Sequence, residues 1–232
     1  MLIVKTGTAR TALTDADCDF EDWIAHGLGR PVKVCTVFEG DELPDPHAAG
    51  GVVVTGSAAM VSDREAWIER TAEWLRDAVE AGAPTLGICF GHQLLAHAFG
   101  GRVAPNPRGR EIGTVSLSLA GAAAADPLLS GLPARIEVQA THLESVLDLP
   151  PGAELLASST LDPHHAFRMP GRPAWGLQFH PEFSAAITRS YTEAKRQDMQ
   201  AEGLDPDRLL AGVRETNWGG DILARFAHLA NG

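Results

Sequence analysis

The chain has 232 residues, of which 44% are hydrophobic, and a formal net charge of −11 with an isoelectric point near 5.2. This length and composition suit one α/β domain with a full hydrophobic core. The acidic balance argues against a nucleic-acid partner, and no apolar run is long enough to span a membrane. The three cysteines, Cys18, Cys35 and Cys89, are too few and too widely spaced for a disulfide framework or a zinc site. We therefore expect a cytoplasmic enzyme in a reducing compartment.

The first hundred residues alternate predicted strands and predicted helices. The N-terminus lacks the charged and apolar regions of a signal peptide and is expected to form the first strand. A helix with an apolar face follows, for which Asp15 or Asp17 can supply the cap. The expected strands are 2–5, 32–38, 51–55 and 86–88, with further helices from about residue 63 and from residue 90. This alternation predicts βαβ units and a parallel, doubly wound sheet.

The second half has shorter expected elements. Strands are predicted at 112–119, 136–140 and 154–157, and a hairpin at 166–168 and 174–179. Residues 39–46 and 105–109 are expected to be loops, and the tail to be helical at 185–197 and from 207 to 229. The predicted fold is one α/β domain over residues 1–232, with a core of about 1–183 and C-terminal helices over 184–232. Its central sheet is expected to be mostly parallel, flanked by helices, with a small antiparallel addition.

Cys89 lies where a short apolar strand changes to a helical pattern. Gly87 and Gly91 leave room for a tight turn that lifts the side chain clear of both elements. The amides at the helix start favour a thiolate over a thiol. These features describe a nucleophile on a strand-to-helix turn, whereas a lone cysteine after an apolar strand can equally be a small buried hydrophobe.

Two motifs help to decide whether Cys89 is a nucleophile or a buried hydrophobe. Gly87-Ile-Cys-Phe-Gly-His-Gln93 resembles the nucleophile motif of class I (triad-type) glutamine amidotransferases. Trp175-Gly-Leu-Gln-Phe-His-Pro-Glu-Phe183 is similar to the His-Pro-Glu signature of the same family, although a His–Glu pair alone can be a surface pair. The resemblance extends from the first strand to about residue 183 and implies a flavodoxin-like fold. It is nearest to stand-alone members related to the glutaminase half of GMP synthetase.

The resemblance implies a catalytic triad. Cys89 would attack the amide, His180 would act as base and then acid, and Glu182 would hold the imidazole. The amide of Phe90 and, by resemblance, that of Gly56 would form the oxyanion hole. Gly56-Ser57-Ala58 stands where many members have Gly-Gly-Pro.

Other matches concern the substrate pocket. Gln93 would contact the γ-glutamyl group, or is a helix-surface amide. Thr141-His-Leu-Glu-Ser-Val146 resembles the family's His-x-Asp-x-Val segment, with Glu144 in place of the usual Asp. By that resemblance the segment lines the glutamine pocket, with His142 as a substrate-binding residue, or the ammonia exit; the alternative is a plain loop. Asp162-Pro-His-His165 lacks partners at metal-ligand spacing and is expected to be a solvated turn. We expect no metal and no cofactor.

The leading functional hypothesis is hydrolysis of a γ-glutamyl amide such as glutamine, with ammonia passed to a separate synthetase partner. One alternative is a γ-glutamyl peptide hydrolase that needs no partner, and another is a non-catalytic regulatory relative. The loop from Ala104 to Arg110, which is rich in Pro, Gly and Arg, and the segment at 141–144 are the candidate mobile parts of the site.

Overall fold

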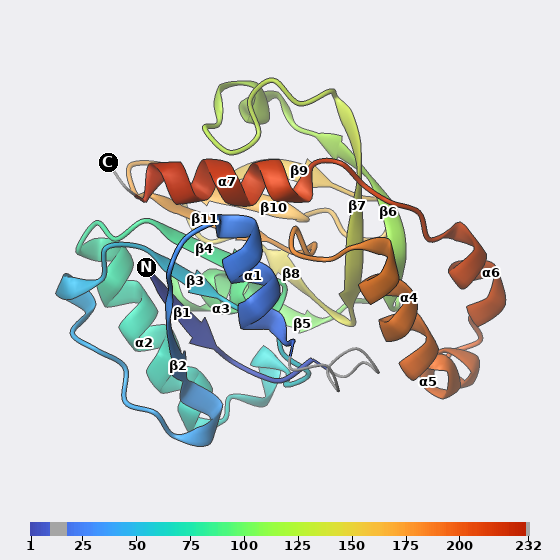
Figure 1. Cartoon of the computed structure of the whole chain (residues 1–232), viewed down its shortest axis with the longest axis horizontal. Helices are drawn as coiled ribbons and strands as arrows, with labels where there is room; N and C mark the ends of the chain where they lie inside the picture. The colour runs from blue at the N-terminus through green and yellow to red at the C-terminus, as the bar shows by residue number, and fades with distance from the viewer. Residues whose placement is uncertain (10–17, 231–232) are drawn as a thin grey trace.

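The computed structural model describes residues 1–9 and 18–230 (Figure 1). Apolar runs in the first half and one late run form the parallel half of a nine-stranded sheet, with strand order β2-β1-β3-β4-β11. Every residue of β3, β4 and β11 is buried, as expected for strands that are covered on both faces. The bounds of these strands are β1 Leu2–Lys5, β2 Lys33–Thr36, β3 Val52–Val54, β4 Thr85–Ile88 and β11 Ala174–Leu177.

The sheet continues beyond β11 with four antiparallel strands in the order β10-β9-β6-β7. Their bounds are β6 Glu111–Leu119, β7 Arg135–His142, β9 Glu154–Ser158 and β10 Ala166–Met169. This extension is larger than the small addition that the sequence predicts. The connections here contain no crossover helix, so successive strands return antiparallel. The predicted α/β class with a parallel core is confirmed.

A separate two-stranded sheet pairs β5 (Arg102–Pro105) with β8 (Glu144–Asp148). The sequence predicts no strand in either segment and leaves a plain loop possible at 141–146. Both strands are short, and they lie about forty residues apart along the chain. No pattern of neighbouring residues therefore predicts either strand. The pairing fixes the β7–β8 turn next to the end of β5.

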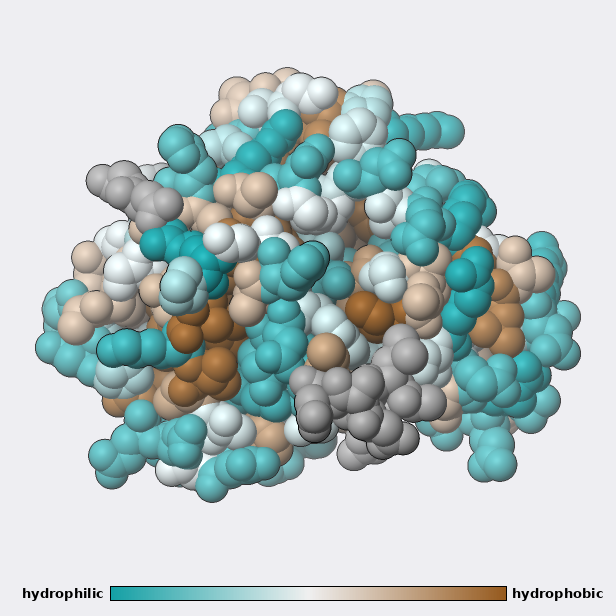
Figure 2. Space-filling model, in the orientation of Figure 1, coloured by the Kyte–Doolittle hydropathy of each residue, from teal (hydrophilic) through white to brown (hydrophobic). Residues whose placement is uncertain are grey.

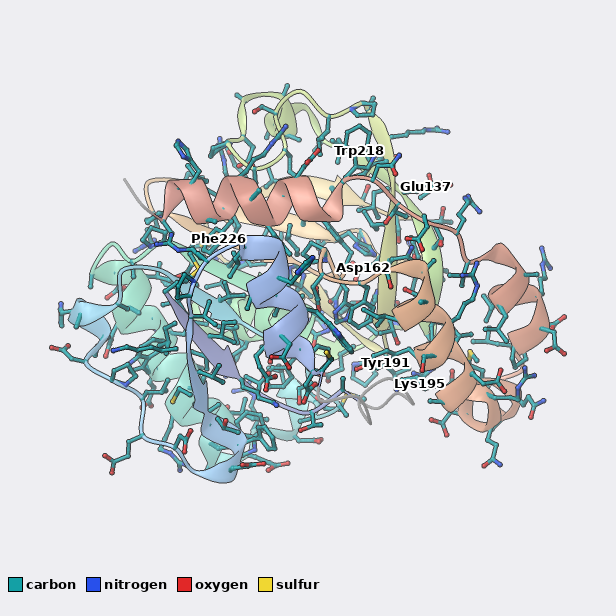
Figure 3. The ribbon with its side chains drawn as sticks, viewed as in Figure 1. Glu137, Asp162, Tyr191, Lys195, Trp218 and Phe226 are labelled. Atoms are coloured by element: carbon teal, nitrogen blue, oxygen red, sulfur yellow. The ribbon has the colours of Figure 1, made fainter. Side chains whose placement is uncertain are left out.

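Helices cover both faces of the parallel half (Figure 1). α1 (Phe20–Leu28) and α7 (Gly219–Leu229) pack on one face with Ile3 and Val53, and α2 (Ala66–Glu80) and α3 (Phe90–Ala98) pack on the other with Val52 and Val54. The alternation follows from the two-residue period of a strand. Figure 3 shows Phe226 on the side of α7 that faces the sheet. Its ring packs edge-on against that of Trp175, with the ring centroids 6.4 Å apart.

The first helix is capped by Asp19, whose side chain accepts from the amide of Phe20. The predicted caps, Asp15 and Asp17, lie outside the described residues. The amide of Asp19 in turn donates to the side chain of Asp22, which completes a capping box.

The C-terminal tail forms α4 (Ala185–Ala194), α5 (Arg196–Ala201) and α6 (Pro206–Gly212) before α7. The tail is helical from 206 to 212 and from 219 to 229, so the helical stretch predicted from 207 to 229 is interrupted at 213–218. Val213 is extended, and its carbonyl accepts from Arg189 of α4 at 2.6 Å, which holds the break between α6 and α7.

Hydrophilic side chains dominate the face in Figure 2, and its hydrophobic areas are small and separated. Within residues 1–9 and 18–230, no helix combines the length and the apolar character needed to cross a membrane.

Candidate active site

Cys89 occupies a strained turn between β4 and α3. Its φ of 52° and ψ of −102° are unusual for a residue with a side chain, and such conformations cost about 1–3 kcal/mol. The flanking glycines make the turn possible. A Cβ on Gly87 would lie 2.3 Å from the carbonyl oxygen of Gly91, and a Cβ on Gly91 would lie 2.4 Å from that of Val54. The tight corner that the sequence predicts is therefore present.

His180 and Glu182 follow the end of β11 and form a buried pair. The distance between His180 Nδ1 and Glu182 Oε1 is 2.7 Å, and the side chains are 2% and 0% exposed. The ring of Phe183 stacks on the imidazole with centroids 4.0 Å apart, which fixes the plane of the ring. The alternative of a surface pair is wrong.

The sheet brings Cys89 and His180 together. β4 and β11 are adjacent parallel strands, so the residues just beyond their carboxyl ends emerge at the same edge. Both side chains line a cavity of about 40 Å³, to which Thr141 and Tyr191 also contribute. Cys89 Sγ donates to the carbonyl oxygen of Thr141 at 3.7 Å. In Figure 3, Tyr191 lies between α4 and α1, and its ring contacts that of Phe20.

The electrostatic surroundings of His180 favour its charged form. Burial alone would lower its pKa, but the negative charges of Glu182 and Cys89 and the hydrogen bond with Glu182 raise the pKa to about 10. The arrangement therefore holds His180 as an imidazolium beside the sulfur of Cys89.

The amides of Phe90 and Gly56 lie next to this pair. The loop that contains Gly56 is tied to α3 by a bond from the amide of Gly91 to the carbonyl oxygen of Thr55 at 3.2 Å. A Cβ on Gly56 would lie 3.0 Å from His180 Cε1, so the loop runs against the imidazole. Among the residues that the structure describes, neither amide donates a hydrogen bond.

A second cavity, of about 230 Å³, shares Cys89 with the first. Gln93 lines it, and its Nε2 donates at 2.9 Å to the carbonyl oxygen of Glu144 and at 2.9 Å to Gln178 Oε1. Gln93 is 4% exposed, so the interpretation as a helix-surface amide is wrong. The wall carries two cationic and two anionic side chains, which are Arg110, Lys195, Glu144 and Asp198.

Two of these four charged side chains, Lys195 and Asp198, were not predicted from the sequence, whereas Arg110 and Glu144 lie in the two candidate mobile segments. Lys195 and Asp198 lie on or beside α4 and α5, and Arg110 is held by two bonds to Glu202 of 2.9 and 2.7 Å. The sequence holds no motif that links residues 110, 195 and 198, because only the packing of the tail against β6 and β7 brings them to the cavity.

His142 also lines this cavity and belongs to a buried cluster. The register of β6 and β7 places Glu111 opposite His142, and Glu111 Oε2 lies 3.1 Å from His142 Nε2 and 2.8 Å from His165 Nε2. One potential ligand atom from each of these three residues lies within 4.8 Å of the others. Asp162 and His165 are 0% exposed, so the expected solvated turn is wrong. The partners missing from the Asp-Pro-His-His motif come from other strands.

Comparison with known proteins gives consistent matches. The model of the family described as "Glutamine amidotransferase class-I" matches residues 12–195. A GMP synthase [glutamine-hydrolyzing] from Thermomicrobium roseum is 42% identical over 132 residues, which cover 57% of this chain and 23% of that protein. A protein from Thermococcus kodakarensis that is named as one subunit of GMP synthase [glutamine-hydrolyzing] is 37% identical over 119 residues, which cover 49% of this chain and 61% of that protein.

Among solved structures, a glutamine amido transferase from Methylobacillus flagellatus superimposes with a TM-score of 0.78 at 23% identity, covering 98% of this chain and 94% of that one. The chain spans 23% of the length of the Thermomicrobium roseum GMP synthase and 32% of that from Aeropyrum pernix.

Proposed function

Because the chain belongs to the class I glutamine amidotransferase family, we propose that it hydrolyses the γ-amide of glutamine through a γ-glutamyl thioester on Cys89. The ammonia released would serve a separate acceptor enzyme. One observation carries this proposal: a cysteine on a strained strand-to-helix turn shares a cavity with a buried His180–Glu182 pair.

The first half of the reaction forms the thioester. The sulfur of Cys89 attacks the carboxamide carbon, and the carbonyl oxygen takes up the negative charge. The C–N bond then breaks as His180 Nε2 gives its proton to the departing nitrogen. Water then attacks the thioester, with His180 removing a proton from it, and glutamate and the free sulfur result. Glu182, 2.7 Å from Nδ1, keeps the imidazole oriented and steadies its positive charge.

The amides of Phe90 and Gly56 would bind the oxygen of the tetrahedral intermediate. Loss of one such donor typically raises the barrier by about 3 kcal/mol. Phe90 starts α3, so its N–H also has the positive end of the helix dipole behind it.

The second cavity suits the amino-acid end of glutamine. Its paired charges complement a zwitterion, with Arg110 and Lys195 for the α-carboxylate and Glu144 and Asp198 for the α-amino group. Gln93 stands one turn after Cys89 on α3, where it can contact the γ-glutamyl chain. His142 lines the same cavity.

The expected partner is a synthetase chain. The Thermococcus kodakarensis relative is named as one subunit of its enzyme, which supports a glutaminase that works with a second chain. Free thiols at Cys18, Cys35 and Cys89 support a reducing, cytoplasmic setting.

A γ-glutamyl peptide hydrolase remains the second candidate, favoured by one observation. A groove of about 590 Å³, lined by Phe38 and Trp67, adjoins the catalytic cavity through Ser57 and Ala58. This groove offers space for a leaving group larger than ammonia.

Steady-state assays of the isolated chain with glutamine and with γ-glutamyl peptides test these functions. The amidotransferase proposal expects slow glutamine hydrolysis that an added GMP synthetase chain raises. Fast peptide cleavage with poor glutamine turnover would support the second candidate. Absence of turnover on either substrate would instead support a non-catalytic relative. Cys89→Ser should abolish every activity, and Cys35→Ser, at a buried thiol remote from the site, is the matched control.

A further inference from the structure

We propose that Thr6 and Ser57 are positioning residues, whose hydroxyl groups fix the backbone of the loop at 55–59 that follows β3. Ser57 lines the catalytic cavity together with Cys89. The inference rests on the proposed function, in which the amide of Gly56 from this loop binds the oxygen of the tetrahedral intermediate. It adds to the site a residue that directly follows β1 and that lies in none of the motifs around the triad.

Two successive carbonyl oxygens of the loop converge on Thr6. Thr6 Oγ1 lies 3.0 Å from the carbonyl oxygen of Thr55 and 3.2 Å from that of Gly56. The hydroxyl of Thr55 donates to the carbonyl oxygen of Gly56 at 3.0 Å and accepts from the amide of Thr6 at 3.0 Å. Thr6 and Thr55 are 1% and 0% exposed, so solvent does not reach these bonds. Removal of the Thr6 hydroxyl would leave buried carbonyl oxygens short of a donor.

These carbonyl contacts determine where the N–H groups of the loop point. In a planar trans peptide, an N–H group points opposite to the carbonyl group of the preceding residue. The carbonyl oxygen of Thr55 also accepts from the amide of Gly91 at 3.2 Å, so two donors hold this peptide. The N–H groups of Gly56 and Ser57 therefore both point away from Thr6. Successive N–H groups on one side of a backbone attract an anion, such as the oxygen of the tetrahedral intermediate.

Ser57 holds the next part of the loop. Its Oγ donates to the carbonyl oxygen of Thr6 at 2.7 Å and accepts from the amide of Ala59 at 3.1 Å. A hydroxyl has one proton, so Ser57 has no further hydrogen bond to donate to a substrate. Gly7 permits this close approach, because a Cβ there would lie 2.6 Å from Ser57 Oγ and 3.0 Å from Ser57 Cα. The two hydroxyl groups thus tie the loop to the end of β1.

Steady-state hydrolysis of glutamine by the full chain tests the positioning role. Ser57→Ala removes both bonds of that hydroxyl, and Thr6→Val removes the other hydroxyl with little change of shape. Each variant should lower kcat about tenfold or more and change the KM for glutamine less than about threefold, because the oxyanion exists only along the reaction and not in bound glutamine. Formation and hydrolysis of the thioester both pass through an oxyanion, so kcat falls whichever of these two steps limits the rate.

Two further variants separate this role from a general loss of stability. Thr6→Ser keeps the hydroxyl and should keep kcat within about threefold of wild type. Thr85→Val removes a buried hydroxyl at the start of β4, where it donates to the carbonyl oxygen of Ala83 at 2.9 Å, and should leave kcat and KM unchanged. Thermal unfolding measures the stability that each variant loses. A fall in kcat in Thr85→Val as large as that in Thr6→Val would overturn the positioning role.

The kinetic pattern separates this inference from the proposed function. A wild-type kcat in Ser57→Ala or Thr6→Val would overturn the role of that residue and leave the proposed function standing. A raised KM with an unchanged kcat would also overturn it, since that pattern marks a contact with bound substrate. If the wild-type chain hydrolyses no glutamine, the proposed function fails and the positioning role fails with it. If Thr6→Val does not fold, Ser57→Ala decides, because Ser57 is a half-buried loop residue.

Discussion

Replacement of Glu182 by glutamine should shift the alkaline limb of the pH–rate profile to lower pH. The variant keeps an oxygen that can accept from His180 Nδ1, 2.7 Å away in the native chain, but it removes the negative charge. Burial lowers the pKa of His180, and Glu182 is the foremost of the groups that together raise it from 6.5 to about 10. An opposite charge at this distance typically changes a pKa by about 1 to 3 pH units.

The direction of this shift in the alkaline limb follows from the proposed reaction. The proposed mechanism needs a proton on His180 to release ammonia, and that proton is lost as the pH rises through the pKa. With a pKa near 10, about nine tenths of wild-type His180 is protonated at pH 9, against about one tenth if the pKa falls to about 8. The ratio of variant to wild-type kcat/KM should therefore fall about tenfold between pH 7 and pH 9.

The assay is ammonia release from glutamine across this range. Glu215→Gln is the matched control, because Glu215 and Glu182 both line a further cavity of about 240 Å³, and Glu215 accepts a bond from the amide of Ala185 instead of from the imidazole. His180→Ala should lose far more activity than Glu182→Gln at every pH, since it removes the proton carrier itself. An alkaline limb in Glu182→Gln that overlays that of wild type would refute the pairing of this carboxylate with the proposed catalytic imidazole of His180.

Two further predictions concern the strained turn. A glutamine-analogue electrophile should label Cys89 and leave Cys18 and Cys35 unmodified in peptide mass spectra; since Cys18 is exposed, its modification with Cys89 intact would contradict the assigned nucleophile. Gly87→Ala should lower the free energy of unfolding by about 1–3 kcal/mol or more, because its Cβ would meet the carbonyl oxygen of Gly91 at 2.3 Å. Thermal unfolding should show no comparable loss for Gly121→Ala, where a Cβ meets nothing within 4 Å.

The sequence alone was sufficient for features that depend on a few neighbouring residues. The buried run before Cys89 predicts β4, and the glycines at 87 and 91 predict the tight corner, since both follow from local periodicity and steric room. The Pro181 turn after β11 likewise predicts that Glu182 comes back to His180. The parallel core follows from the same local signals, because strands separated by helices have few alternative arrangements.

Tertiary structure decided what depends on register and on packing of distant segments. The β6–β7 register sets Glu111 against His142, and the bend before β10 adds His165, so a buried cluster forms from residues that no spacing connects. The tail helices bring Lys195 and Asp198 to the cavity in the same way. A side chain's own neighbours in sequence determine whether it lies in a strand or a helix, but its partners across the fold determine its charge and its contacts.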